Sequence, residues 1–141
     1  MPLSLPTLGA LDAAIIDLDG TLVDTLGDFA EALNRTLAEL ALPAIEATAI
    51  ERMVGKGTEH LLRSVLNHVL GQKNQAVCAI NFEDSAAQAL YERAWAAYHR
   101  HYPEVNGRYS AVYPGAEEGL RALRDAGLCL ACLTNKPGDF A

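Results

Sequence analysis

The chain has 141 residues, of which 50% are hydrophobic and 21% charged, so it can bury a core and is not expected to be disordered. Its formal net charge of −7, without a basic run, argues against nucleic acid and anionic membrane as partners. No segment approaches the ~18 apolar residues of a transmembrane helix, and the start lacks the pattern of a signal peptide, so a cytoplasmic location is expected.

A short apolar run, Ala13–Ile16, predicts a buried strand that ends directly before Asp17 and Asp19. Gly20 predicts a turn that rotates Asp19 away from Asp17, at the end of a strand where ligands bind in open α/β sheets. Two close carboxylates repel unless a cation separates them, and Mg²⁺ prefers such oxygens. One Asp can then act as a nucleophile and its neighbour as general acid and base, while Thr21 and the N–H groups of the turn can face phosphate oxygens. An acidic turn without chemistry is the alternative.

A long helical stretch follows. The apolar spacing predicts helices over about 26–40, 50–54, 61–70 and 83–101. We expect Gly55 and Gly71 to end the second and third helices and Pro103 to stop the fourth, with residues 72–81 irregular. Four helices without an intervening strand are typical of a separate small bundle.

Strand and helix alternation then resumes. Residues 113–115, Tyr-Pro-Gly, predict the start of a helix that ends at Gly127. The apolar run 128–133 predicts the next strand, so the pattern indicates a βαβ crossover in a parallel sheet.

The run contains Cys129 and Cys132, which have CxxC spacing. Residues three apart in a strand face opposite sides, so a redox pair or zinc knuckle is disfavoured. We interpret both as small buried residues.

Residues 17–24, with the sequence DLDGTLVD, resemble the first motif of the haloacid dehalogenase-like hydrolases. The resemblance implies that Asp17 is the nucleophile and Asp19 the general acid and base. It also implies that Asp17, with the backbone carbonyl of Asp19, helps to hold Mg²⁺. Ile16 stands where the family often has Phe.

Thr134 resembles the family's second motif, whose Ser or Thr hydrogen-bonds the transferring phosphoryl group. Asn135 matches the following residue, which helps to shape the phosphate loop. Simple helix capping is the alternative for this turn. Lys136 could steer anions or simply be solvated, and the sequence leaves both open.

Residues 54–57, Val-Gly-Lys-Gly, resemble a Val-Gly-x-Gly loop in the caps of bacterial phosphoglycolate phosphatases. Lys56 stands where that loop often has Asn. The loop could reach the non-phosphoryl end of an anionic substrate, or it could be an ordinary turn between helices.

The predicted fold class is α/β, with a doubly wound parallel-sheet (Rossmann-like) core, incomplete here, and a helical cap inserted after the first strand. Residues 1–22 and 107–141 are predicted to form the core, and residues 23–106 the cap, which resembles that of many family members. Such a cap could close over the acids and exclude water.

The resemblance implies a phosphoric monoester hydrolase that uses Mg²⁺ and an aspartyl-phosphate to hydrolyse a small phosphate monoester, first of all 2-phosphoglycolate. The family's third-motif Lys and fourth-motif acids are not found, so we expect a fragment with little activity alone, whose parent is the phosphatase. A sugar-phosphate mutase of the same fold and a non-catalytic binding module with a vestigial core remain alternatives. The oligomeric state cannot be inferred.

Overall fold

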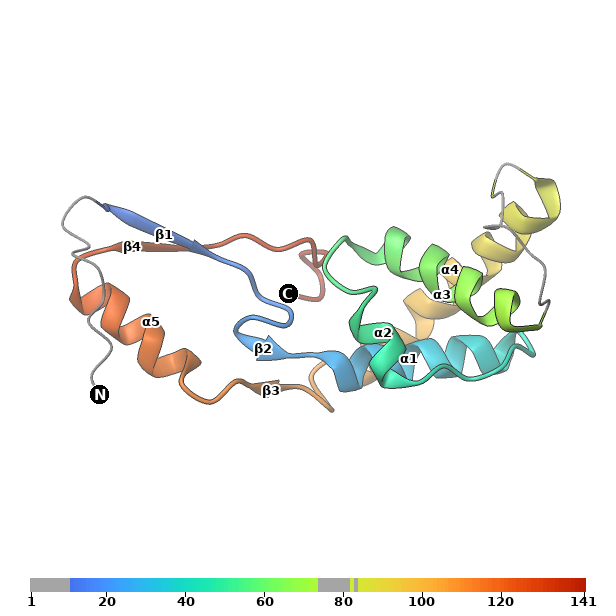
Figure 1. The fold of residues 1–141 in the computed structure, drawn as a ribbon, viewed down its shortest axis with the longest axis horizontal. Helices are drawn as coiled ribbons and strands as arrows, with labels where there is room; N and C mark the ends of the chain where they lie inside the picture. Colours follow the sequence, from blue (N-terminus) through green and yellow to red (C-terminus); the bar gives the residue numbers. More distant parts are fainter. Residues whose placement is uncertain (1–10, 74–81, 83) are drawn as a thin grey trace.

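The computed structural model describes residues 11–73, 82 and 84–141 of the chain. Its elements in chain order are β1 (Ala13–Ile16), β2 (Val23–Asp24), α1 (Leu26–Glu39), α2 (Ala47–Glu51), α3 (Thr58–Lys73), α4 (Ser85–Val105), β3 (Ala111–Val112), α5 (Ala116–Asp125) and β4 (Cys129–Cys132). Figure 1 shows β1, β4 and α5 at one end and the helices α1 to α4 at the other, with β2 and β3 between them. The helices and the parallel strand pair confirm the α/β class.

Strands β1 and β4 pair in parallel, from Ala13 opposite Cys129 to Ile16 opposite Cys132. Helix α5 precedes β4, and Gly127 follows it with a φ of 89°, in the left-handed conformation that commonly ends helices. The two strands and their pairing agree with the sequence prediction.

The predicted burial of these strands is wrong. Ile15 is 70% exposed, Leu130 is 36% exposed, and Cys129 and Cys132 are exposed free thiols. The physical reason is that, in the described part of the chain, this sheet has only two strands, with α5 packed against β4. Both faces of a strand become buried only when further strands and helices cover them.

The apolar core lies instead among the helices, where α1 packs against α2 and α4, and α3 also packs against α4. Phe29, Leu33 and Leu37 are buried on one face of α1, which confirms the predicted helical spacing. Tyr98 and Tyr102 of α4 are each 1% exposed and join this core. None of the helices in the described residues combines the length and apolarity needed to cross a membrane.

Three helix ends differ from the sequence predictions. Helix α2 ends at Glu51, before Gly55, and α3 continues through Gly71 to Lys73. Helix α4 continues through Pro103 to Val105. Proline removes one helical hydrogen bond and crowds the carbonyl four residues earlier. The burial of Tyr102 and Val105 in the core offsets this cost and holds the last turn. Of the predicted irregular stretch 72–81, residues 74–81 lie outside the described residues.

Strands β2 and β3 were not predicted from the sequence. Val23 pairs with Val112 and Asp24 with Ala111 in an antiparallel arrangement. Two residues are too few to show the alternation that identifies a strand. This pairing brings together the chain that enters the helices and the chain that leaves them. The division into a cap of residues 23–106 and a core stays a prediction.

Asp28, in the first turn of α1, is a completely buried acid. Its carboxylate accepts the N–H of Gly107 at 2.8 Å, the N–H of Tyr109 at 2.7 Å and the hydroxyl of Ser110. These donors lie in the segment between α4 and β3, so Asp28 ties the start of the helices to their exit. A buried carboxylate is tolerated because its hydrogen bonds are satisfied.

We expect Asp28→Ala to lower the free energy of unfolding by about 3 kcal/mol, because it removes three hydrogen bonds to a buried carboxylate and leaves their partly buried donors without an acceptor. Urea unfolding followed by circular dichroism measures the effect. Glu118→Ala is the matched control, because Glu118 is an exposed acid in the first turn of α5 and should change stability by less than ~0.5 kcal/mol. Equal stabilities of the two variants would contradict this interpretation of Asp28.

Candidate active site

The turn after β1 folds back on the carbonyl of Leu18. That oxygen accepts the N–H groups of Thr21, Leu22 and Val23 at 3.3, 3.0 and 3.1 Å, and Gly20 donates to the Val23 carbonyl at 2.8 Å. Gly20 has a φ of 77°, which favours glycine. In this structure the N–H groups of Gly20 and Thr21 both donate inside the turn. That N–H groups of the turn face phosphate oxygens stays a prediction. A contribution of these two residues to substrate binding stays a prediction.

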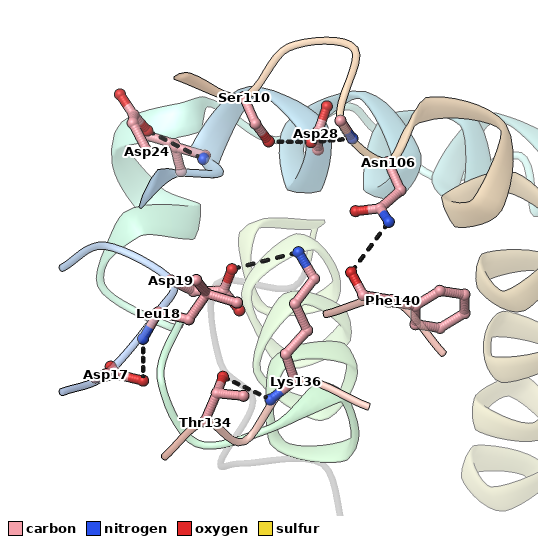
Figure 2. A network of polar contacts seen from close by, with 12 residues as sticks. Asp17, Leu18, Asp19, Asp24, Asp28, Asn106, Ser110, Thr134, Lys136 and Phe140 are labelled. Atoms are coloured by element: carbon pink, nitrogen blue, oxygen red, sulfur yellow. Dashed lines mark hydrogen bonds and ion pairs between the residues drawn. The ribbon is translucent and has the colours of Figure 1, made fainter. Parts of the chain in front are cut away.

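The turn gives the two acids different environments. Asp17 is exposed, and its Oδ1 accepts the N–H of Leu18 at 2.8 Å. The Asp19 side chain is only 11% exposed, and its Oδ1 lies 3.4 Å from Nζ of Lys136. Figure 2 shows Asp19 and Lys136 pointing toward one another, with Asp17 to one side. The carboxylates of Asp17 and Asp19 therefore point in different directions, as the turn at Gly20 predicts.

The end of β4 brings the second set of polar groups to this place. The Leu133 N–H donates to the Ile16 carbonyl at 3.0 Å, which extends the parallel pairing to the ends of both strands. Thr134 follows, and its Oγ1 accepts the N–H of Lys136 at 3.1 Å. Thr134 and Asp17 line the same pocket, as expected for the carboxyl ends of neighbouring parallel strands.

Lys136 is buried rather than solvated, so one of the two sequence interpretations is wrong. Its side chain is 6% exposed, and its ammonium lies 6.0 Å from the ring centre of Phe29 and 5.7 Å from that of Tyr102. Asp19 compensates the charge of the ammonium, and the aromatic faces add a favourable cation–π contribution. Removing either charged partner would leave the other buried and unpaired.

The loop that precedes α3 lies against the loop after β4. Nδ2 of Asn135 donates to the carbonyl of Gly55 at 2.8 Å, and a Cβ added at Gly57 would lie 3.9 Å from the Asn135 carbonyl oxygen. Val54 and both glycines line the pocket. Lys56 is exposed and does not line it. The backbone of this loop, rather than the predicted Lys56 side chain, therefore faces the candidate site in this structure.

Aromatic side chains form one wall of the pocket. The rings of Phe29 and Tyr102 stack at 5.6 Å, those of Tyr98 and Tyr102 stack at 5.2 Å, and Phe140 lies edge-on to Tyr102 at 5.0 Å. Burial, followed by the charge of Asp19 among other groups, raises the pKa of Tyr102 above its ordinary value, and burial likewise raises the pKa of Tyr98. Both phenols are therefore neutral near pH 7.

A second hollow adjoins the first and shares Asp19, Phe29, Val54 and Gly55 with it. Gly20, Asp24, Glu51 and Tyr113 are among the residues that line it. Asp24 Oδ1 accepts the N–H of Leu26 at 3.1 Å, which agrees with the interpretation of Asp24 as a hydrogen-bonding linker residue. Three acidic residues, Asp19, Asp24 and Glu51, therefore line this second hollow.

The sequence motifs identified Asp17, Asp19, Thr134 and Asn135, and the structure brings all four to the contact between the two loops. The aromatic wall was missed as part of the site, because its spacing on α1 and α4 is that of ordinary core residues. The sequence leaves the role of Lys136 open, although its place two residues after Thr134 is a usable signal. The Thr134 side chain accepts from the Lys136 backbone, and this turn directs the lysine inward.

The predicted Mg²⁺ site has only part of its ligands in the described residues, in which no group of three or more His, Cys, Asp or Glu side chains lies together. Mg²⁺ is commonly held by one or two carboxylates together with water and substrate phosphate oxygens. The Asp17 carboxylate and the Asp19 backbone carbonyl are hard oxygen donors of this kind. The donor set therefore fits Mg²⁺, and the assignment of Asp17 and Asp19 as its ligands stays a prediction.

Residues 11–141 match the family described as haloacid dehalogenase-like hydrolase, and the chain belongs to that family. Curated relatives named phosphoglycolate phosphatase include a plasmid-encoded protein of Cupriavidus necator, 42% identical over 92% of this chain and 50% of its own length. Another, from Rhodospirillum rubrum, is 40% identical over 89% of this chain and 48% of its own length. The chain thus spans about half the length of the curated relatives it matches.

Solved structures agree with the fold. A crystal structure described as a predicted phosphoglycolate phosphatase from Haemophilus somnus superposes with a TM-score of 0.76 at 26% identity, covering 92% of this chain and 53% of that one. CbbY from Rhodobacter sphaeroides, solved in complex with phosphate, has a TM-score of 0.56 at 18% identity, covering 91% and 52%. At that identity the second likeness concerns the fold alone.

The buried tyrosines predict a loss of stability at high pH. Tyr98 and Tyr102 have a raised pKa in the folded state, whereas tyrosine in the unfolded chain ionises at pH ~10. Their contribution to the free energy of unfolding is therefore complete below that pH and declines above it. We expect the free energy of unfolding to fall by about 1 kcal/mol per tyrosine per pH unit above 10. Urea unfolding at pH 9 and pH 11 measures this. The Tyr98→Phe/Tyr102→Phe double variant should show a smaller pH dependence, and an unchanged dependence would refute the assignment.

Proposed function

We propose that the protein is a Mg²⁺-dependent phosphatase that hydrolyses a small phosphate monoester through an aspartyl-phosphate intermediate. The observation that carries the proposal is the meeting of the ends of β1 and β4, which lines one pocket with Asp17, Asp19, Thr134 and Lys136. A nucleophile, a possible proton carrier, a hydroxyl donor and a cation thereby face one space beneath the loop of residues 54–57. Membership of the hydrolase family supports the same chemistry.

In the proposed reaction an oxygen of the Asp17 carboxylate attacks phosphorus, the bond between phosphorus and the ester oxygen breaks, and Asp19 gives a proton to the departing alkoxide. Asp19 then takes a proton from water as that water attacks the phosphoryl group on Asp17. Phosphate leaves and the Asp17 carboxylate is restored. Thr134 donates its hydroxyl hydrogen to a phosphoryl oxygen, and Asn135 holds the loop that carries Thr134.

Asp17 and the Asp19 backbone carbonyl would hold the Mg²⁺ ion, which reduces the repulsion between an anionic nucleophile and an anionic ester. The aromatic wall and the loop of residues 54–57 line the pocket beside the reacting groups. Lys136 contributes a positive charge next to the proton carrier Asp19.

The proposed first substrate is 2-phosphoglycolate, which would yield glycolate and phosphate. The names of the relatives from Cupriavidus necator and Rhodospirillum rubrum support this choice, and so does the small pocket with a single lysine. We also propose that the 141 residues alone turn over slowly, because only two acids are contributed to the metal site by the described residues. The cytoplasmic location stays a prediction.

The test is release of phosphate from 2-phosphoglycolate by the complete gene product, with Mg²⁺ and after its removal by EDTA. We expect Asp17→Asn to lower kcat by about 10³-fold or more and Asp19→Asn by about 10²-fold to 10⁴-fold. Asp12→Asn is the control, because Asp12 is an exposed acid that directly precedes β1. Rapid quenching with labelled substrate should trap the label on the wild-type protein but not on Asp17→Asn.

Turnover that survives Asp17→Asn would exclude Asp17 as the nucleophile. Transfer of the phosphoryl group between two positions of a sugar, instead of to water, would identify a mutase. Failure to bind both Mg²⁺ and a phosphate analogue would favour a non-catalytic binding module. Rapid Mg²⁺-dependent turnover by the 141-residue chain would contradict the part of the proposal that concerns the isolated chain.

A further inference from the structure

The hydroxyl of Tyr102 is a buried polar group without a partner. Tyr102 is 1% exposed, and its Oη has no hydrogen-bond partner among the described residues. Buried hydroxyls are nearly always paired, because an unpaired one loses its hydrogen bonds to water and gains none. Since Tyr102 lines the pocket that contains Asp17, Asp19 and Thr134, a ligand in that pocket can supply the missing acceptor.

The ring of Tyr102 is held in place, so its hydroxyl is prepositioned. Phe29 and Tyr98 stack on the ring, Phe140 packs edge-on, and the Asn106 side chain donates to the Phe140 carbonyl at 3.1 Å. A ring packed in this way cannot turn its hydroxyl toward solvent without disrupting the core. The position of the donor is therefore determined before a ligand binds, which lowers the entropic cost of binding.

The ammonium of Lys136 lies next to this hydroxyl-bearing ring, 5.7 Å from the ring centre. Among the described residues that line the pocket, Lys136 is the only cationic side chain. The charged groups that act on Tyr102 are Asp19 and Asp28, and burial with these two charges raises the pKa of Tyr102. The phenol is thus a neutral O–H donor beside a cation.

We propose that Tyr102 Oη and Lys136 Nζ form a subsite for the carboxylate of the substrate, in the pocket that Asp17 and Asp19 also line. The inference rests on the proposed phosphatase function and assigns the group that selects its substrate. Thr134 and Asp17 take the phosphoryl end, and Asp19, 3.4 Å from Lys136 Nζ, gives its proton to the departing ester oxygen. An O–H donor and an ammonium suit a small oxyanion, whereas the surrounding rings disfavour a larger polar group.

The test compares 2-phosphoglycolate with 2-hydroxyethyl phosphate, which has a neutral hydroxymethyl group in place of the carboxylate. With the complete gene product we measure kcat/KM for both esters. Tyr102→Phe keeps the stacked ring and removes only the hydroxyl. We expect it to lower the preference for 2-phosphoglycolate about tenfold, mainly through KM. Lys136→Met should lower the same preference at least as much. Tyr109→Phe, at a tyrosine that is 55% exposed, is the control and should leave the preference unchanged.

Calorimetric titration with 2-phosphoglycolate, on Asp17→Asn protein so that no ester is consumed, gives a readout that does not depend on turnover. We expect Kd to rise about tenfold when Tyr102→Phe is added. Equal Kd values together with an unchanged preference would overturn the subsite and leave a water molecule as the partner of the hydroxyl. Absence of binding to the starting protein would overturn it as well. Binding that depends on Tyr102 without hydrolysis of either ester would overturn the proposed function and retain the subsite.

Discussion

The buried carboxylate of Asp28 is the interaction on which the arrangement of the chain depends. It holds the segment 107–110, where the chain leaves the helices, against the first turn of α1, where the chain enters them. The short β2–β3 pairing continues this contact toward the sheet. Because the segments that enter and leave the helices lie side by side, α5 and β4 return to β1. Residues more than a hundred positions apart, such as Asp19 and Lys136, thereby come into contact. An exposed acid at position 28 could be solvated by water and would add little to stability. A buried acid is tolerated only when its hydrogen-bond donors are in place, so burial of Asp28 requires the segment 107–110 to lie against it.

The same turn of α1 connects the fold to the site. Asp28 faces the segment after α4, and its neighbour Phe29 stacks on Tyr102 and lines the pocket. From the other side, Asn106 contacts the Phe140 carbonyl, and Asn135 contacts the Gly55 carbonyl. The loop that carries Thr134 and Lys136 is therefore held between the helices and the sheet, as Figure 2 shows for its contacts with Asp19 and Asn106.

The sequence predicted what depends on local pattern. Strand β1, the glycine turn after it, and the acids at its end follow from a few adjacent residues, as do the helical spacing of α1 and the strand before Thr134. It could not predict what depends on distant partners. The exposure of Ile15 reflects how much of the sheet is covered, the passage of α4 through Pro103 reflects packing of Tyr102, and the burial of Lys136 reflects its partner Asp19. Each of these features depends on packing or pairing with parts of the chain that are distant in sequence.

The charge of the site explains why a single lysine matters in a protein whose net charge is −7. Asp17 and Asp19 line the pocket, and Asp24 and Glu51 line the adjoining hollow, so an anionic ester would meet repulsion on both sides. In the proposed mechanism a divalent cation held by Asp17 and the Asp19 backbone carbonyl would offset only part of this negative charge. In the proposed function Lys136, whose side chain is shielded from solvent, would supply the positive charge that attracts an anion to the site. Its burial strengthens that attraction, because salt and water screen it less than they would a surface lysine.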